Sequence, residues 1–223
     1  MPNSTTRRFE QFWASEKSLA VLLVILLIHI FIVFPLGESR IGRIASVTFY
    51  FLLLSAGMFY FTHTRKDVGK LLLSIVALAS LCIGFFAQQR LLDLLTDFSL
   101  LLFCCLLVWA VLVKTFSEGP VTFYRIQGAI VVYLLLSLIF SIVYQLFFQL
   151  KGVTAFNGLS GSPENSFIYF SLTTLTSTGF GDISPALPSI RSVANLESLI
   201  GQLYPAILIA RLVSMEYEAS KNR

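Results

Sequence analysis

Charged residues are scarce in this chain. They make up 13% of its 223 residues, whereas 56% of the residues are hydrophobic. Soluble globular domains carry about 25% charged residues, so the composition excludes an ordinary soluble domain and favours a membrane protein. The basic residues behind the net charge of +4 are spread through short segments. That spread argues against a nucleic-acid partner, because nucleic-acid-binding proteins gather basic residues on one face.

Histidine and cysteine are also rare. The two histidines lie in separate segments, and the three cysteines, Cys82, Cys104 and Cys105, stand at spacings that fit no zinc or redox motif. Neither a nucleophile with its base nor a metal-ligand set can be assembled from these residues. We therefore expect no enzyme activity and no cofactor.

Long apolar runs are abundant instead, and each approaches the roughly 20 residues that cross the hydrocarbon of a bilayer. A shorter run, Phe167 to Ser177, suits a re-entrant helix shielded by protein. The expected fold is therefore an all-α membrane protein with six transmembrane helices and a re-entrant helix between the fifth and sixth. The six predicted spans are Leu19 to Leu36, Ile44 to Phe61, Leu71 to Ala87, Leu94 to Val113, Ile126 to Phe148 and Leu187 to Val213.

The predicted spans lack the arginines of a voltage sensor. The fourth span holds no Lys or Arg between Arg90 and Lys114, and the first three are equally bare. Each charge that moves through the membrane field contributes about 2.3 kcal/mol per 100 mV, so a sensor needs several of them on one helix. The first four helices are expected to form a scaffold without strong voltage dependence.

The segment from Thr174 to Asp182, TLTSTGFGD, carries the clearest functional pattern. Gly179 and Gly181 alternate with larger residues, and glycine adopts positive φ values that other residues adopt at a cost. Such a backbone can turn successive carbonyls to one side, where a ring of them replaces the water shell of a cation. We predict an ion selectivity filter at Ser177, Thr178, Gly179, Phe180 and Gly181.

This segment resembles the signature Thr-Val-Gly-Tyr-Gly-Asp of the tetrameric potassium channel family. Gly179, Gly181 and Asp182 match it, whereas Ser177 replaces Thr, Thr178 replaces Val or Ile, and Phe180 replaces Tyr. The resemblance runs from about Tyr124 to Val213. It implies potassium ions bound at the filter residues and Asp182 at the outer filter mouth. It also implies filter support from an aromatic pair, Tyr169 and Phe170, and a hinge glycine at Gly201.

One copy of this segment supplies only a quarter of a fourfold carbonyl ring. Because the chain shows no internal repeat, we expect a homotetramer embedded in membrane lipid. Glu118-Gly119-Pro120 interrupts the apolar pattern and divides the chain. The expected parts are a cytoplasmic segment 1–17, a four-helix accessory domain 18–116, a pore domain 117–213 and a short cytoplasmic tail 214–223.

Loop charge predicts the orientation. With the N-terminus in the cytoplasm, most basic residues fall in inner segments, as the positive-inside rule requires. Both termini are then cytoplasmic, Asp182 faces outward, and the cell membrane is the expected location. The inner basic residues are Arg7, Arg8, Lys17, Arg65, Lys66, Lys70, Lys114, Arg125, Arg211, Lys221 and Arg223.

The short helix before the filter has a clear start signal, because Ser162-Pro163-Glu164 combines an N-cap hydroxyl, a proline at the first helical position and an acidic first turn. Its C-terminal partial negative charge would favour a cation nearby. Three threonines at its end, Thr173, Thr174 and Thr176, are candidates for hydrogen bonds around the filter; bonding within the helix is the alternative.

The last predicted span contains four candidate residues. Pro205 cannot donate a hydrogen bond to the carbonyl of Gly201, so a gating hinge is expected there, with close helix packing at Gly201 as the alternative. Glu197 could line the central cavity or bond to hydroxyls behind the filter, and the second is favoured because facing carboxylates repel. Gln202 could line the cavity or join two helices, and the sequence does not decide between them.

The expected function is passive conduction of potassium through a fourfold carbonyl filter. A weakly selective monovalent cation channel is the alternative, because Ser177, Thr178 and Phe180 depart from the signature. A cation transporter subunit is less favoured, since transporters bind at broken helices of two repeats and this chain shows no such pair.

Overall fold

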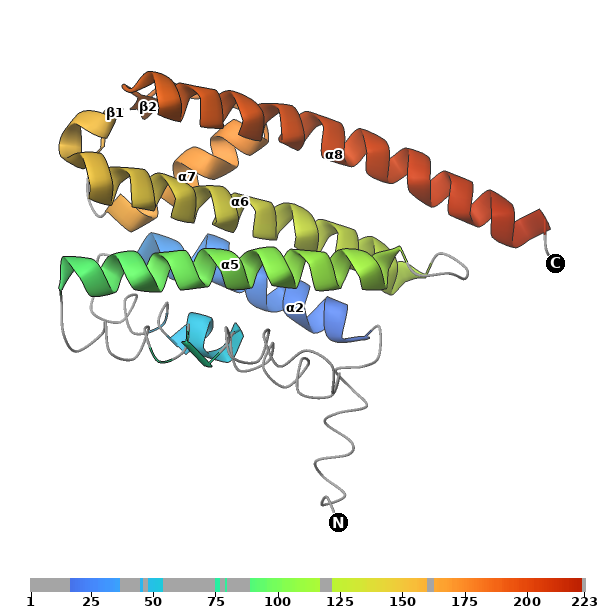
Figure 1. Cartoon of the computed structure of the whole chain (residues 1–223). Helices are drawn as coiled ribbons and strands as arrows, with labels where there is room; N and C mark the ends of the chain where they lie inside the picture. Colours follow the sequence, from blue (N-terminus) through green and yellow to red (C-terminus); the bar gives the residue numbers. More distant parts are fainter. Residues whose placement is uncertain are drawn as a thin grey trace, which may run out of the picture.

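The structure is a computed structural model that describes residues 17–36, 45, 48–53, 75–76, 79, 89–116, 122–159 and 163–221. This part of the chain is mostly helical (Figure 1). Most of the second and third predicted spans, all of 1–16 and the predicted break at 117–121 lie outside the described residues. The total of six spans therefore stays a prediction.

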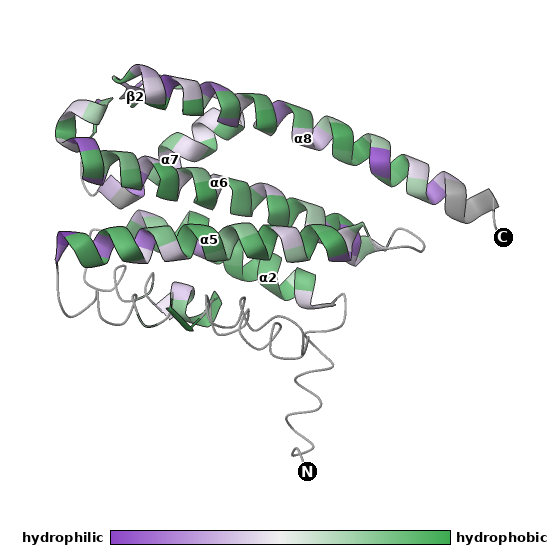
Figure 2. Ribbon diagram, viewed as in Figure 1, coloured by the Kyte–Doolittle hydropathy of each residue, from purple (hydrophilic) through white to green (hydrophobic). Residues whose placement is uncertain are grey.

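Four helical segments of the described part are long and apolar enough to cross a membrane, and they correspond to the first, fourth, fifth and sixth predicted spans. Hydrophobic residues dominate three of them, while the last is more mixed (Figure 2). This pattern indicates a multi-pass membrane protein. The four segments are Ser18–Leu36, Arg90–Thr115, Phe123–Ala155 and Pro188–Tyr217.

The first segment changes its helical pitch along its length. Helix α2 (Lys17–Ile28) continues as a π-helical turn, η1 (His29–Val33), and a 3-10 turn, η2 (Phe34–Leu36). His29 is buried at this change, and its ring stacks on that of Phe49 with 3.6 Å between the centroids. Both ring nitrogens lack a hydrogen-bond partner among the described residues, so aromatic packing is what holds this imidazole there.

Helix α6 (Phe123–Lys151) is central, with α2 and α5 (Arg90–Thr115) packed against it. It is apolar almost all round, which suits a helix that has neighbours on several sides. Leu26 from α2, Phe103 from α5 and Leu135 from α6 are each fully buried in the cluster between them. These contacts join the first and fourth spans to the fifth.

Polar contacts fix the ends of these helices. The Arg90 guanidinium donates to the Gln149 carbonyl at 2.5 Å, and the Gln149 amide donates to Asp97 at 2.8 Å. At the opposite end of α5, Lys114 Nζ donates to Ser18 Oγ at 2.9 Å. The charged residues of α5 thus lie at its ends and hold it against α2 and α6.

Helix α7 (Pro163–Leu175) has 13 residues, matches the predicted short helix, and packs against both α6 and α8 (Figure 1). Its length is about 20 Å at 1.5 Å per residue, less than the roughly 30 Å of a bilayer core. An aromatic cluster fills the space between these helices and the loop that precedes α7. Its buried members include Phe140, Tyr144, Phe156, Phe167 and Phe170.

A two-stranded ribbon joins the loops on either side of α7. After the 3-10 turn η3 (Gly152–Ala155), strand β1 (Phe156–Asn157) pairs antiparallel with β2 (Ser184–Pro185). Gly158, with φ of 78°, follows β1, and a Cβ there would collide with the carbonyl of Asp182. Only glycine allows this close approach, which holds the segment after α7 against the end of α6.

Helix α8 (Pro188–Lys221) runs unbroken for 34 residues and passes through Pro205. It continues eight residues beyond the predicted end at Val213, and its C-terminal end lies beyond the ends of α5 and α6 (Figure 1). Several apolar side chains on α8 are about half exposed or more. They are Leu196, Leu199, Leu203, Ile207, Ile209 and Val213.

Candidate functional site

The segment after α7 folds back onto the last turn of that helix. The Thr173 carbonyl accepts from the amides of Thr178 at 2.8 Å and Gly179 at 3.1 Å, and the Thr174 carbonyl accepts from Ser177 at 2.9 Å. These bonds use the carbonyls that every helix end leaves without an intrahelical partner. The end of α7 therefore fixes where the segment begins.

The sign of φ alternates along this segment. It is positive at Ser177 (55°), Gly179 (54°) and Gly181 (81°), and not at Thr178 or Phe180 between them. The positive φ predicted for the two glycines is confirmed. Ser177 was not predicted to share it, and it is the one non-glycine residue of the described part with positive φ. A left-handed conformation costs a residue with a Cβ roughly 1–2 kcal/mol.

The residues from Ser177 to Gly181 are exposed in the single chain. A Cβ added at Gly179 or Gly181 would meet no atom within 4 Å, so these glycines serve backbone conformation and not close packing. The Thr176 hydroxyl donates to the Leu172 carbonyl at 2.7 Å and lies 2.8 Å from that of Thr178. One face of the segment is thus supported by α7, and the other is open.

The predicted aromatic pair divides between two environments. Tyr169 stacks on Phe180 with 6.2 Å between ring centroids, and its hydrogen bond to Asp182 raises the pKa of the Tyr169 phenol. Phe170 points away and packs against Tyr144 at 4.9 Å and Phe156 at 5.7 Å. Only Tyr169 therefore contacts the segment directly.

The three predicted support threonines, Thr173, Thr174 and Thr176, also differ in which of their atoms contact the segment after α7. The Thr173 hydroxyl donates to the Phe170 carbonyl at 3.0 Å, which is bonding within α7, while its own carbonyl holds the segment. Thr174 contributes its carbonyl, and Thr176 bonds both within α7 and to Thr178.

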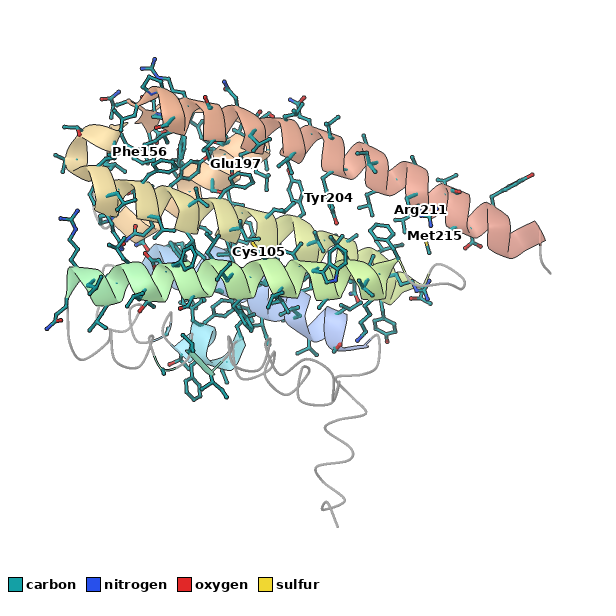
Figure 3. All side chains as sticks on the ribbon, in the orientation of Figure 1. Cys105, Phe156, Glu197, Tyr204, Arg211 and Met215 are labelled. Atoms are coloured by element: carbon teal, nitrogen blue, oxygen red, sulfur yellow. The ribbon has the colours of Figure 1, made fainter. Side chains whose placement is uncertain are left out.

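Glu197 is fully buried where α8 meets α6 and α7 (Figure 3). Tyr144 donates its phenolic hydrogen to Glu197 Oε2 at 2.5 Å, and Ser171 Oγ is bonded to Glu197 Oε1. Ser171 Oγ also lies 2.8 Å from the Ser137 carbonyl. The alternative favoured from the sequence, bonding to hydroxyls of the short helix, is confirmed for this side chain.

Gln202 reaches the segment from α8. Its amide nitrogen donates to Ser177 Oγ at 3.0 Å, and Ser198, one helical turn earlier, has its Oγ 3.1 Å from the same oxygen. Gln202 thus bonds to the segment after α7 and not to a second helix, and its side chain is exposed, so the choice between lining a cavity and joining two helices stays open.

Gly201 is buried against the end of α7, where a Cβ would collide with the Leu175 carbonyl. Tyr133 of α6 donates its hydroxyl hydrogen to that carbonyl at 3.1 Å and lies 3.5 Å from the carbonyl of Gly201. Three residues later α8 is bonded to α6 again, since Tyr204 Oη donates to the Ala129 carbonyl at 2.8 Å. Close packing is therefore observed at Gly201, and the hinge at Gly201 and Pro205 stays a prediction.

Four residues of this site were not predicted: Tyr133, Tyr144, Ser171 and Ser198. Ser198 stands four residues before Gln202, a spacing that places both on one helix face, so the sequence held a signal for it. The hydroxyls around Glu197 come from different helices, and no spacing in the sequence joins them.

An ion channel family model matches residues 128–218, which is less than half of the chain and includes most of α6, all of α7 and nearly all of α8. No curated protein and no solved structure matches the chain significantly. The match supports an ion channel and coincides with the part that holds the candidate site. No group of His, Cys, Asp and Glu that could hold a metal ion occurs within the described residues.

Proposed function

We propose that the protein is a potassium channel whose selectivity filter is the segment from Ser177 to Gly181. The observation that carries the proposal is the alternation of positive φ at Ser177, Gly179 and Gly181 directly after a short helix. A backbone of alternating handedness turns successive carbonyls to one side, and carbonyl rings bind a dehydrated cation. The match to the ion channel family supports the same conclusion.

The channel is a homotetramer in this proposal. The filter residues are exposed in one subunit, and Phe180 is 69% exposed despite its apolar ring. The exposed apolar side chains of α8 extend this unpartnered surface, and such surfaces mark interaction sites. Three further copies around one axis would cover both and complete each carbonyl ring.

The ion path would run along that axis between the two sides of the cell membrane. Helix α7 ends at the filter, so four partial negative charges, each about half an elementary charge, point towards the ion. Asp182 lies at the outer mouth with its carboxylate bonded to Tyr169. Both termini are then cytoplasmic.

Reversal potentials of the purified protein in planar bilayers, with potassium and sodium on opposite sides, test this proposal. The expected value lies near the potassium equilibrium potential. A value midway between those of the two ions would instead identify a weakly selective channel. Absence of any current from intact tetramers would overturn the assignment of a channel.

Substitution of Gly179 by Ala tests the filter itself. A Cβ at a positive φ costs about 1 kcal/mol or more per subunit, so the ring should distort and potassium current should fall by at least about tenfold. Gly152→Ala is the matched control, because Gly152 also has positive φ with open space around it but lies outside the site. Equal currents in the two variants would contradict the filter assignment.

A further inference from the structure

The Ser177 side chain is held from α8 by two groups. Gln202 Nε2 donates to Ser177 Oγ at 3.0 Å, and Ser198 Oγ lies 3.1 Å from it. Gln202 and Ser198 stand one turn apart on one helix face, while Ser177 belongs to the segment after α7. The inner end of the segment is therefore fixed both by its own helix and by the next one.

Serine at this position needs such support more than threonine does. The second heavy atom on Cβ restricts the χ1 angle of threonine, and serine lacks it. The Ser177 hydroxyl is also exposed in the single subunit, so packing does not select one rotamer. Without the two bonds from α8, its oxygen would be distributed over several positions.

The hydrogen bonds of the Ser177 hydroxyl leave one of its lone pairs available to a ligand. A serine hydroxyl has one hydrogen to donate and two lone pairs to accept. Gln202 occupies one lone pair, and the contact with Ser198 can take the hydrogen. One lone pair of Ser177 Oγ then remains for a cation, at a position set by two bonds.

We propose that Gln202, assisted by Ser198, is a positioning residue that orients the Ser177 hydroxyl as a ligand for the ion at the inner end of the filter and so contributes to cation selectivity. The inference rests on the proposed function. It assigns to α8 a part of the selectivity that the signature threonine would supply through its own stiff side chain.

Gln202→Met removes the donor at similar length and volume. The potassium-to-sodium permeability ratio from reversal potentials should fall by at least about fivefold, the factor that corresponds to one ordinary hydrogen bond. Asn195→Met, which changes another exposed amide of α8 that no contact places in the site, should keep the wild-type ratio. Ser198→Ala should lower the ratio in the same direction by a smaller factor.

The Ser177→Thr background distinguishes positioning from a general structural role. In that background Gln202→Met should retain a ratio close to that of Ser177→Thr alone, because threonine holds its own rotamer. An equal fall in both backgrounds would show that Gln202 acts on something other than the Ser177 hydroxyl.

The outcomes also separate this inference from the proposed function. A wild-type protein without potassium selectivity would contradict the proposed function. A selective wild type whose Gln202→Met and Ser198→Ala variants keep its ratio overturns only the positioning role. If Gln202→Met fails to assemble, the permeability ratio of Ser198→Ala alone decides whether α8 positions the Ser177 hydroxyl. That variant removes one hydroxyl group and leaves the helix otherwise unchanged.

Discussion

At the residue scale, the protons around Glu197 can be counted. The Ser171 hydroxyl has a single hydrogen, yet it is bonded to Glu197 Oε1 and lies 2.8 Å from the Ser137 carbonyl. The carbonyl can only accept, so Ser171 either donates to Glu197 or, if its hydrogen goes to the carbonyl, accepts from a protonated Glu197. Tyr144 donates to the other carboxyl oxygen. Every bond is satisfied if Glu197 carries a proton on Oε1, and a neutral acid also avoids an unpaired charge in the buried interior.

Glu197→Gln should therefore preserve stability and conduction. The amide nitrogen can donate to Ser171 and the amide oxygen can accept from Tyr144, which reproduces the neutral acid atom for atom. Glu197→Ala should lower the free energy of unfolding by about 2–4 kcal/mol, because it opens a cavity and leaves two hydroxyls unpaired. Thermal melting of the detergent-solubilised protein measures stability, and ion flux measures conduction. A Gln variant as damaged as the Ala variant would show that the carboxyl is ionised.

At the element scale, α8 approaches the end of α7 closely at Gly201. Gly201→Ala places a Cβ against the Leu175 carbonyl, a backbone atom that cannot turn aside. Overpacking of this kind costs about 1–3 kcal/mol, so the melting temperature should fall. Gly128→Ala in α6 is the comparison, since the three atoms nearest to its Cβ belong to the Thr115 and Leu19 side chains and not to the backbone. An equal fall in melting temperature in the two variants would mean that the close approach at Gly201 is no less tolerant of a Cβ than the packing around Gly128.

Pro205 should act differently from Gly201. Pro205→Ala supplies an amide hydrogen to the Gly201 carbonyl and removes a proline that costs a helix interior about 3 kcal/mol. Stability should rise or stay level while the open probability in single-channel records falls, because the bend becomes harder to form. An unchanged open probability would leave Pro205 without a gating role.

The helices also show which features of the fold could be predicted from the sequence and which could not. The long spans could be predicted because lipid selects continuous apolar runs, but α8 continues past Val213 to Lys221 since Arg211 and Glu216 weaken the apolar signal without breaking a helix. Tyr169 and Phe170 could not both face the segment after α7, because adjacent helix residues point about 100° apart.

Most contacts between helices and loops could not be predicted from the sequence. The φ values of Gly179 and Gly181 follow from glycine chemistry, whereas the positive φ of Ser177 and its bonds to α8 depend on how α7 is rotated against α8. Glu197 could be assigned to hydroxyls in general because a buried carboxyl needs partners. Their identities, Tyr144 and Ser171, come only from the packing of three helices.

At the scale of the whole molecule, the charge distribution sets the response to voltage. The two basic residues of α5, Arg90 and Lys114, lie at its ends and are bonded to α6 and α2. Neither is placed to cross the membrane field, and the sequence of the first four predicted spans holds no ladder of basic residues, so we expect few elementary charges to move on opening. The open probability should change little over 100 mV compared with a channel that moves three or four charges per subunit at about 2.3 kcal/mol each. Macroscopic conductance-voltage curves measure it, and an effective gating charge of several units would contradict this prediction.

Helix α8 has more contacts before Pro205 than after it, and this allows its last part to act as a lever. Its first half is held by the β1–β2 ribbon, by Glu197 and by the approach at Gly201. Beyond Pro205, Met215 is the one buried side chain among the described residues, whereas Ile207, Ile209 and Val213 are more than 60% exposed. The arm from Pro205 to Lys221 is about 24 Å long at 1.5 Å per residue. A rotation of about 10° at Pro205 would displace its tip by about 4 Å, by the same helix geometry. In the proposed tetramer, four such arms would change the width of the opening between them by about 8 Å, without any movement of the proposed filter.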